Sequence, residues 1–131
     1  MGKTKQIKLG IADDAPFIRE IVRQIINSDK SLALVAEARD GEEAVGMANE
    51  NELDVILMDM VLPKKNGIAA ASEILQRHPS LKIIACSTLD QENLVMQALE
   101  AGCCNYLTKP FTAEDLKLMI KKSMITKTKG R

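Results

Sequence analysis

The chain has 131 residues, of which 46% are hydrophobic and 27% are charged, a composition that excludes a disordered or fibrous protein and fits about one globular domain. Basic and acidic residues number 18 each, so no overall charge would draw the chain to nucleic acid or to an anionic membrane. No apolar run approaches the roughly 20 residues that span a bilayer, and no apolar secretory signal opens the chain. We therefore expect one cytoplasmic domain over 1–131 with its core at 7–124, no direct nucleic-acid binding and no membrane insertion.

Short apolar runs alternate with amphipathic segments along the chain, a pattern that predicts strands alternating with helices. The predicted strands are 7–12, 32–38, 55–58, 81–86 and 105–107. The predicted helices are 16–26, the segment after Gly41, 68–77, 91–101 and 113–124, and a basic tail follows at 126–131. Five strands alternating with five helices predict an α/β fold, a parallel sheet covered on both faces and joined by right-handed crossovers.

The residues that directly follow the apolar runs are the candidates for a functional site, because ligands of parallel α/β sheets bind beyond the carboxyl ends of the strands. The run 55–58 is apolar at every position, which is typical of a central strand, and it ends at Asp59. The polar residues at or just beyond the other strand ends are Asp13, Asp14, Ser87, Thr88 and Lys109.

Three carboxylates from two strand ends would repel one another unless a cation lay between them. Oxygen ligands at a watery sheet edge favour Mg²⁺, with Asp14 and Asp59 as direct ligands. Lys109 adds a positive charge and Ser87 a hydroxyl donor, which together with the metal suit the oxygens of a phosphoryl group. A carboxylate beside them can act as the nucleophile, so the pattern predicts phosphoryl transfer onto Asp59.

Five motifs in this order resemble bacterial response-regulator receiver domains over 7–124. They are Asp13-Asp14, the heptapeptide 57–63 around Asp59, Asn66-Gly67, Ser87 and the hexapeptide 106–111 around Lys109. The resemblance implies a flavodoxin-like sheet in the order 2-1-3-4-5. It also implies a phosphoacceptor signalling domain that assists its own phosphorylation and dephosphorylation, not an enzyme.

The same resemblance implies a role for each matching residue. Asp59 would accept phosphate from a histidine kinase, and Asp13 and Asp14 would hold Mg²⁺ with the backbone carbonyl of Val61 as a further ligand. Ser87 and Lys109 would contact the phosphoryl group.

Two further residues would report the switch. Tyr106 is the aromatic side chain that would follow the movement of Ser87 and its loop. Thr88 stands where the family usually has alanine, and its bulk would bias the loop motion or the access of partners. The peptide bond between Lys109 and Pro110 would be cis, a form that is realistic only before proline.

Within the family, the segments 15–19 and 86–89 look most like chemotaxis regulators of the CheY type, and they also resemble the receiver of the chemotaxis methylesterase. The chain stops after the predicted fifth helix, which favours the CheY-like interpretation. It implies a histidine kinase as phosphodonor, the flagellar motor switch as a candidate target and a phosphatase as a further contact. The alternative is the receiver of a DNA-binding or methylesterase regulator.

Two other classes of protein remain as alternatives. A hydrolase with Asp59 as a transient phosphoaspartyl nucleophile would need a second acid two residues on, where Val61 stands. A non-phosphorylated interaction module would leave Asp59 unmodified.

In the receiver interpretation, Val61 and Leu89 lie near the path of hydrolytic water and cannot orient it, which predicts slow autodephosphorylation. Cys86, Cys103 and Cys104 form no CxxC pair and are interpreted as packing residues.

Overall fold

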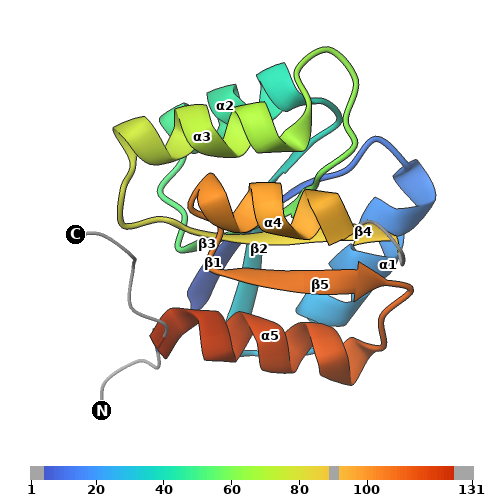
Figure 1. Ribbon diagram of the computed structural model, residues 1–131. Coiled ribbons are helices and arrows are strands. Elements are labelled where there is room, and N and C mark those ends of the chain that lie inside the picture. Colours follow the sequence, from blue (N-terminus) through green and yellow to red (C-terminus); the bar gives the residue numbers. More distant parts are fainter. Residues whose placement is uncertain (1–4, 89–91, 126–131) are drawn as a thin grey trace.

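The computed structural model describes residues 5–88 and 92–125 (Figure 1). The strands are β1 (Ile7–Ala12), β2 (Leu32–Ala38), β3 (Val55–Asp59), β4 (Lys82–Thr88) and β5 (Asn105–Lys109). The helices are α1 (Pro16–Asn27), α2 (Gly41–Glu50), α3 (Gly67–Arg77), α4 (Glu92–Glu100) and α5 (Ala113–Ile125). The predicted alternation of strands and helices is confirmed.

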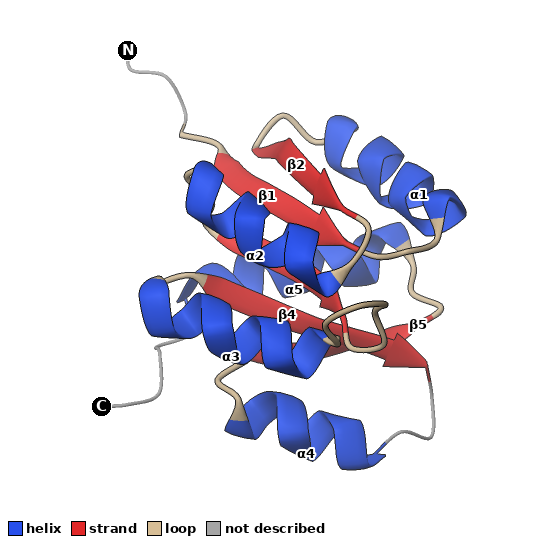
Figure 2. Ribbon diagram, turned by 90° about the horizontal axis from the view of Figure 1, so that it is seen from above, coloured by secondary structure: helices blue, strands red, loops and turns tan. Residues whose placement is uncertain are grey.

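The strands form one 5-stranded sheet in the order β2-β1-β3-β4-β5, and every neighbouring pair is parallel. Both the fold class and the strand order are therefore as expected. Figure 2 shows the arrowheads of the strands pointing toward one edge of the sheet. Because β3 lies in the middle of the order, its last residue, Asp59, lies at the centre of that edge.

Helices cover both faces of the sheet. α1 and α5 lie on one face, and α2, α3 and α4 lie on the other (Figure 1). Alternate residues of β3 point to opposite faces, as the pleat of a strand requires. Val55 and Leu57 join the cluster under α1 and α5, whereas Ile56 and Met58 join the cluster under α2, α3 and α4. The apolar run of β3 is thus buried on both sides, the reason for its uniform composition.

Local signals place the starts of several helices at the carboxyl edge of the sheet. Asp40 caps α2 by accepting the N–H of Glu43 at 2.8 Å, and Asn66 caps α3 by accepting the N–H of Ala69 at 2.9 Å. Pro16 is the first residue of α1, where its missing N–H leaves no bond unmade. The loops that leave the carboxyl ends of β1, β2 and β3 therefore end at these helix starts.

β4 and β5 run further than their apolar runs predicted. Ser87 and Thr88 pair with Thr108 and Lys109, so the ladder continues through polar residues. Apolar periodicity alone could not detect this extension.

The predicted fourth helix is confirmed over Glu92–Glu100. Its predicted first residue and the predicted basic tail at 126–131 lie outside the described residues. Within 5–88 and 92–125, no helix has both the length and the apolar character needed to cross a membrane.

Candidate functional site

Asp13 and Asp14 form the turn between β1 and α1. Asp13 is 3% exposed, and its Oδ1 accepts the N–H of Ala15 at 2.9 Å, while Asp14 is exposed. The backbone N–H of Asp13 donates to the carbonyl of Ala38 at 3.0 Å, which ties the turn to the end of β2. One carboxylate of the pair is therefore held inside the protein, and the other faces solvent.

Asp59 ends β3 and is 8% exposed. Its Oδ1 accepts the N–H of Val61 at 2.9 Å. Burial raises the pKa of the Asp59 carboxyl, and it is opposed first by the N–H of Val61 and then by Lys109. A buried carboxylate with few fixed donors is a poorly solvated anion, which is the form in which an oxygen nucleophile is reactive.

Lys109 ends β5 and joins the two buried carboxylates. Its Nζ lies 2.7 Å from Asp13 Oδ2 and 3.0 Å from Asp59 Oδ2. Burial by itself would lower the pKa of Lys109, but the hydrogen bonds that it donates to Asp13 and Asp59 outweigh this effect, and the net pKa is raised. Lys109 is therefore a fixed cation at neutral pH. Its peptide bond to Pro110 is cis, as the resemblance implied.

The three predicted acids come together at this edge of the sheet. One carboxylate oxygen from each of Asp13, Asp14 and Asp59 lies within 4.8 Å of the other two. These are hard oxygen donors, they carry more negative charge than Lys109 alone can offset, and one of them is open to solvent. That donor set fits Mg²⁺, which keeps several waters and takes few protein ligands.

The remaining predicted residues lie on β4, on β5 and in the loop after Asp59. Ser87 is buried on β4, one residue beyond Cys86, which pairs with Asp59 across the sheet. Thr88 is exposed and pairs with Lys109. Tyr106 is half-buried near the start of β5 and packs against the cluster under α2, α3 and α4. Val61 is exposed, and it contacts Asp59 through its N–H.

Two parts of the site escaped the sequence interpretation. Arg19, to which the sequence assigns no role, donates from Nη1 to the backbone carbonyl of Asp13 at 2.7 Å. Gly67 begins α3 so close to β3 that a Cβ on it would lie 2.2 Å from the carbonyl oxygen of Asp59. The helical spacing of Arg19 and the asparagine–glycine pair were the available signals, but neither one names its partner.

Comparison with known proteins shows the family to which the chain belongs. The response regulator receiver domain family matches residues 9–121. The uncharacterized transcriptional regulatory protein YxjL of Bacillus subtilis is 38% identical over 116 residues, which are 88% of this chain and 53% of YxjL. The chemotaxis protein CheY of Listeria monocytogenes is 36% identical over 108 residues, which are 82% of this chain and 90% of that protein. The chain thus spans about half of YxjL and most of that CheY.

Solved structures agree with the family match. The response regulator domain of Thermotoga maritima CheB has a TM-score of 0.86 and 32% identity, covering 94% of this chain and 99% of that one. The receiver domain of the sensor histidine kinase PA1611 of Pseudomonas aeruginosa has a TM-score of 0.81 and 26% identity, covering 91% of this chain and 98% of that one, and it was solved with a magnesium ion coordinated in its active site cleft. The family match covers most of the chain and the fold agrees with it throughout, so the chain belongs to the response regulator receiver domains of two-component systems.

Proposed function

We propose that the chain is a phosphorylation switch in which Asp59 accepts a phosphoryl group from a histidine kinase. The observation that carries this proposal is the ammonium of Lys109, held between the buried carboxylates of Asp59 and Asp13 at 3.0 and 2.7 Å. It places a fixed positive charge where the oxygens of a phosphoryl group bound to Asp59 would lie.

The chemistry follows from these neighbours. An oxygen of the Asp59 carboxylate attacks the phosphorus of a phosphohistidine, the phosphorus–nitrogen bond breaks, and its electron pair returns to the imidazole, which takes up a proton from solvent. Lys109 and the hydroxyl of Ser87 would donate to the transferred oxygens, and the N–H of Val61 orients the acceptor carboxylate. Mg²⁺, when held by Asp13, Asp14, Asp59 and the carbonyl of Val61, would supply further positive charge against the phosphoryl oxygens.

The output of the switch would be a change in partner binding. Phosphorylated Asp59 would draw Ser87 and its strand end inward, Tyr106 would follow, and Thr88 would set how far the strand end can move. A partner that binds the two states with different affinity then reads the change, because only that difference can shift the equilibrium. In this role the chain is a phosphoacceptor signalling domain that assists its own phosphorylation and dephosphorylation.

The test is phosphorylation by a small phosphodonor, acetyl phosphate with MgCl₂, followed by intact-mass measurement. Wild type should gain one phosphoryl group, and Asp59→Asn should gain none. Glu50→Gln is the matched control, because Glu50 is an exposed carboxylate at the end of α2, where the chain leads to the start of β3 at the opposite edge of the sheet from Asp59. An adduct of equal size on Asp59→Asn, or no adduct on wild type, would sink the proposal.

For the pathway, we propose chemotaxis, with the flagellar motor switch as the target and a phosphatase as a further contact. The supporting observation is the similarity to CheY over 90% of the length of that protein. The second candidate is the receiver of a DNA-binding or methylesterase regulator, which the similarities to YxjL and to the CheB receiver favour. Phosphorylation-dependent binding to a flagellar switch protein, compared between wild type and Asp59→Asn, separates the two.

A further inference from the structure

We propose that Arg19 is a positioning residue for the acid pair: by holding the backbone carbonyl of Asp13, it sets where the carboxylates of Asp13 and Asp14 lie. The proposal rests on the proposed function, since it concerns the same magnesium site. It assigns a task to a side chain that lies on α1 and touches none of the reacting atoms.

The contact itself is short and shielded. Arg19 Nη1 donates to the carbonyl oxygen of Asp13 at 2.7 Å, and the Arg19 side chain is 13% exposed. A hydrogen bond from a charged donor away from water is stronger and more directional than an exposed one. Asp14 is exposed, so the position of its side chain depends on its backbone. The backbone nitrogen of Asp14 is bonded to the carbonyl carbon of Asp13, and Arg19 holds the oxygen of that carbonyl.

The bond completes the restraint of Asp13. Its N–H donates to Ala38, its Oδ1 accepts from Ala15 and its Oδ2 accepts from Lys109. With the carbonyl held by Arg19, every polar group of Asp13 has a partner, and these partners lie on β2, α1 and β5 and in the turn itself. Loss of Arg19 would release the one group that lies between Asp13 and Asp14.

Arg19 is itself held in place from β2. Its Nε lies 3.4 Å from Glu37 Oε1, and both oxygens of Glu37 accept from Arg23, each at 2.9 Å. Figure 2 shows α1 lying beside β2, so that one carboxylate on the strand can reach two arginines on the helix. Glu37 therefore restrains the Arg19 guanidinium from the edge strand, whereas Arg23 pairs with the carboxylates of Glu37 and Glu20 and not with the acid pair.

A positioning role and a purely electrostatic role predict opposite results. Arg19 is a cation beside three carboxylates, so its charge alone opposes the binding of another cation. If charge were its only contribution, removing it would tighten Mg²⁺ binding. If Arg19 positions the carboxylates, removing it weakens Mg²⁺ binding despite the lost repulsion.

The experiment is calorimetric titration of the full chain with MgCl₂. Arg19→Met should raise the dissociation constant by about 10-fold, the lower end for residues that orient metal ligands. Arg23→Met is the matched control, because Arg23 lies on the same helix, is a partner of the same Glu37 and does not reach Asp13. It should stay within about twofold of wild type, as expected for a partly exposed ion pair that does not touch the metal site. Equal or tighter binding by Arg19→Met would overturn the proposal.

Two further measurements keep the test decisive. If Arg19→Met fails to melt cooperatively, Arg19→Lys takes its place. Lysine keeps the charge but cannot contact Asp13 and Glu37 at the same time, so unchanged Mg²⁺ affinity in this variant would overturn the proposal.

Amide hydrogen exchange in metal-free protein gives a measurement that does not depend on the metal. The Asp13 amide should exchange faster in Arg19→Met than in Arg23→Met, and equal rates would contradict the positioning role. Failure of wild type to bind Mg²⁺ or accept phosphate would instead reject the proposed function, and the exchange measurement would still decide the role of Arg19.

Discussion

The Nζ of Lys109 donates to Asp59 Oδ2 at 3.0 Å, although the two residues are 50 positions apart and end different strands of the sheet. The same ammonium donates to Asp13, so one cation serves two buried carboxylates. Each of these carboxylates also accepts one backbone N–H from the residue two positions on. One lysine from β5 therefore links the two buried carboxylates of the site.

Replacing that lysine should be costly. Lys109→Met leaves Asp13 and Asp59 side by side without their shared cation, so we expect the free energy of unfolding to fall by about 2 kcal/mol or more. Urea unfolding of the metal-free protein measures the loss. MgCl₂ should restore part of the lost stability because it binds the folded acids. A variant as stable as wild type would contradict the pairing.

Two glycines of α2 provide a matched pair of substitutions. A Cβ on Gly41 would lie 1.6 Å from the carbonyl oxygen of Lys65, in the loop that follows Asp59, whereas a Cβ on Gly46 meets nothing within 4 Å. Gly41→Ala must therefore displace backbone, and we expect a loss of about 2 kcal/mol or more in urea unfolding, together with slower phosphorylation. Gly46→Ala should gain about 0.5–1 kcal/mol, because alanine is the better helix former. Equal effects at both positions would contradict this account of the loop.

The lifetime of the phosphorylated state should depend on Val61. Its side chain is 59% exposed, two residues beyond Asp59, and it has no group that can orient a water molecule. We expect the adduct on Val61→Asn to decay faster than on wild type, because an amide can hold water for attack at phosphorus. The second apolar position of this hypothesis, Leu89, lies outside the described residues. Intact-mass measurements after removal of the phosphodonor give both rates, and slower decay in the variant would count against the hypothesis.

Asp29, in the turn before β2, should make stability depend on pH in the acid range. Its pKa is lowered to about 2, first by hydrogen bonds from the hydroxyl and N–H of Ser31 and then by Lys121, while burial opposes the shift. An unfolded aspartate titrates near pH 3.9. Between about pH 4 and pH 2 the unfolded chain therefore binds more protons than the folded chain, and the free energy of unfolding decreases as the pH is lowered. The urea midpoints of wild type and Asp29→Asn should differ most at pH 5–7 and converge toward pH 2. A constant difference would argue against this linkage.

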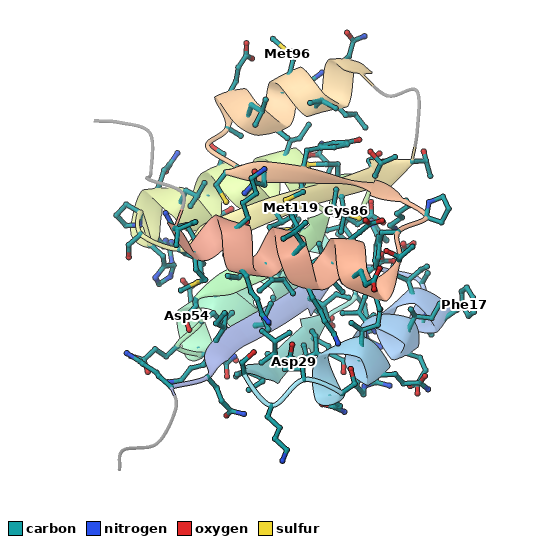
Figure 3. All side chains as sticks on the ribbon, turned by 90° about the horizontal axis from the view of Figure 1, so that it is seen from below. Phe17, Asp29, Asp54, Cys86, Met96 and Met119 are labelled. Carbon is teal, nitrogen blue, oxygen red and sulfur yellow. The ribbon has the colours of Figure 1, made fainter. Side chains whose placement is uncertain are left out.

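The cysteines should differ in reactivity. Burial raises the pKa of both Cys86 and Cys103 to about 12, and Cys104 is half-buried. Figure 3 shows Cys86 within the layers between helix and sheet. Because the thiolate is the reactive form, iodoacetamide near pH 8 should modify Cys104 first. Peptide mass spectrometry gives the order of modification. In denaturant the order should be lost, and early modification of Cys86 in the folded protein would contradict its burial.

Much of the fold was predictable because local patterns carry it. β1 and β2 have the bounds predicted from their apolar runs, and the uninterrupted run of β3 predicted a strand buried on both faces. The ends of β4 and β5 were predicted too short, because Ser87, Thr88, Thr108 and Lys109 are polar and join the sheet through backbone pairing. Backbone hydrogen bonds do not depend on the polarity of the side chain, so hydrophobic periodicity could not reveal them.

The chemistry-bearing residues of the site were readable for the same reason. Asp13, Asp14 and Asp59 each follow an apolar run, and the carboxyl ends of parallel strands meet at one edge. The contacts that hold these carboxylates and their loops in place could not be predicted from the sequence. The sequence does not show that Arg19 reaches the carbonyl of Asp13 or that Gly41 lies against the carbonyl of Lys65.

The sequence by itself determined the alternation of elements, the burial of β3 and the presence of three acids and a lysine at strand ends, because these depend on neighbours within a few positions. Tertiary structure decided which of them touch. Lys109 lies 96 residues from Asp13 and yet donates to it at 2.7 Å, and Glu37 of β2 lies 3.4 Å from the Arg19 side chain that donates to Asp13. Such contacts depend on the packing of distant strands and helices, which no local spacing records.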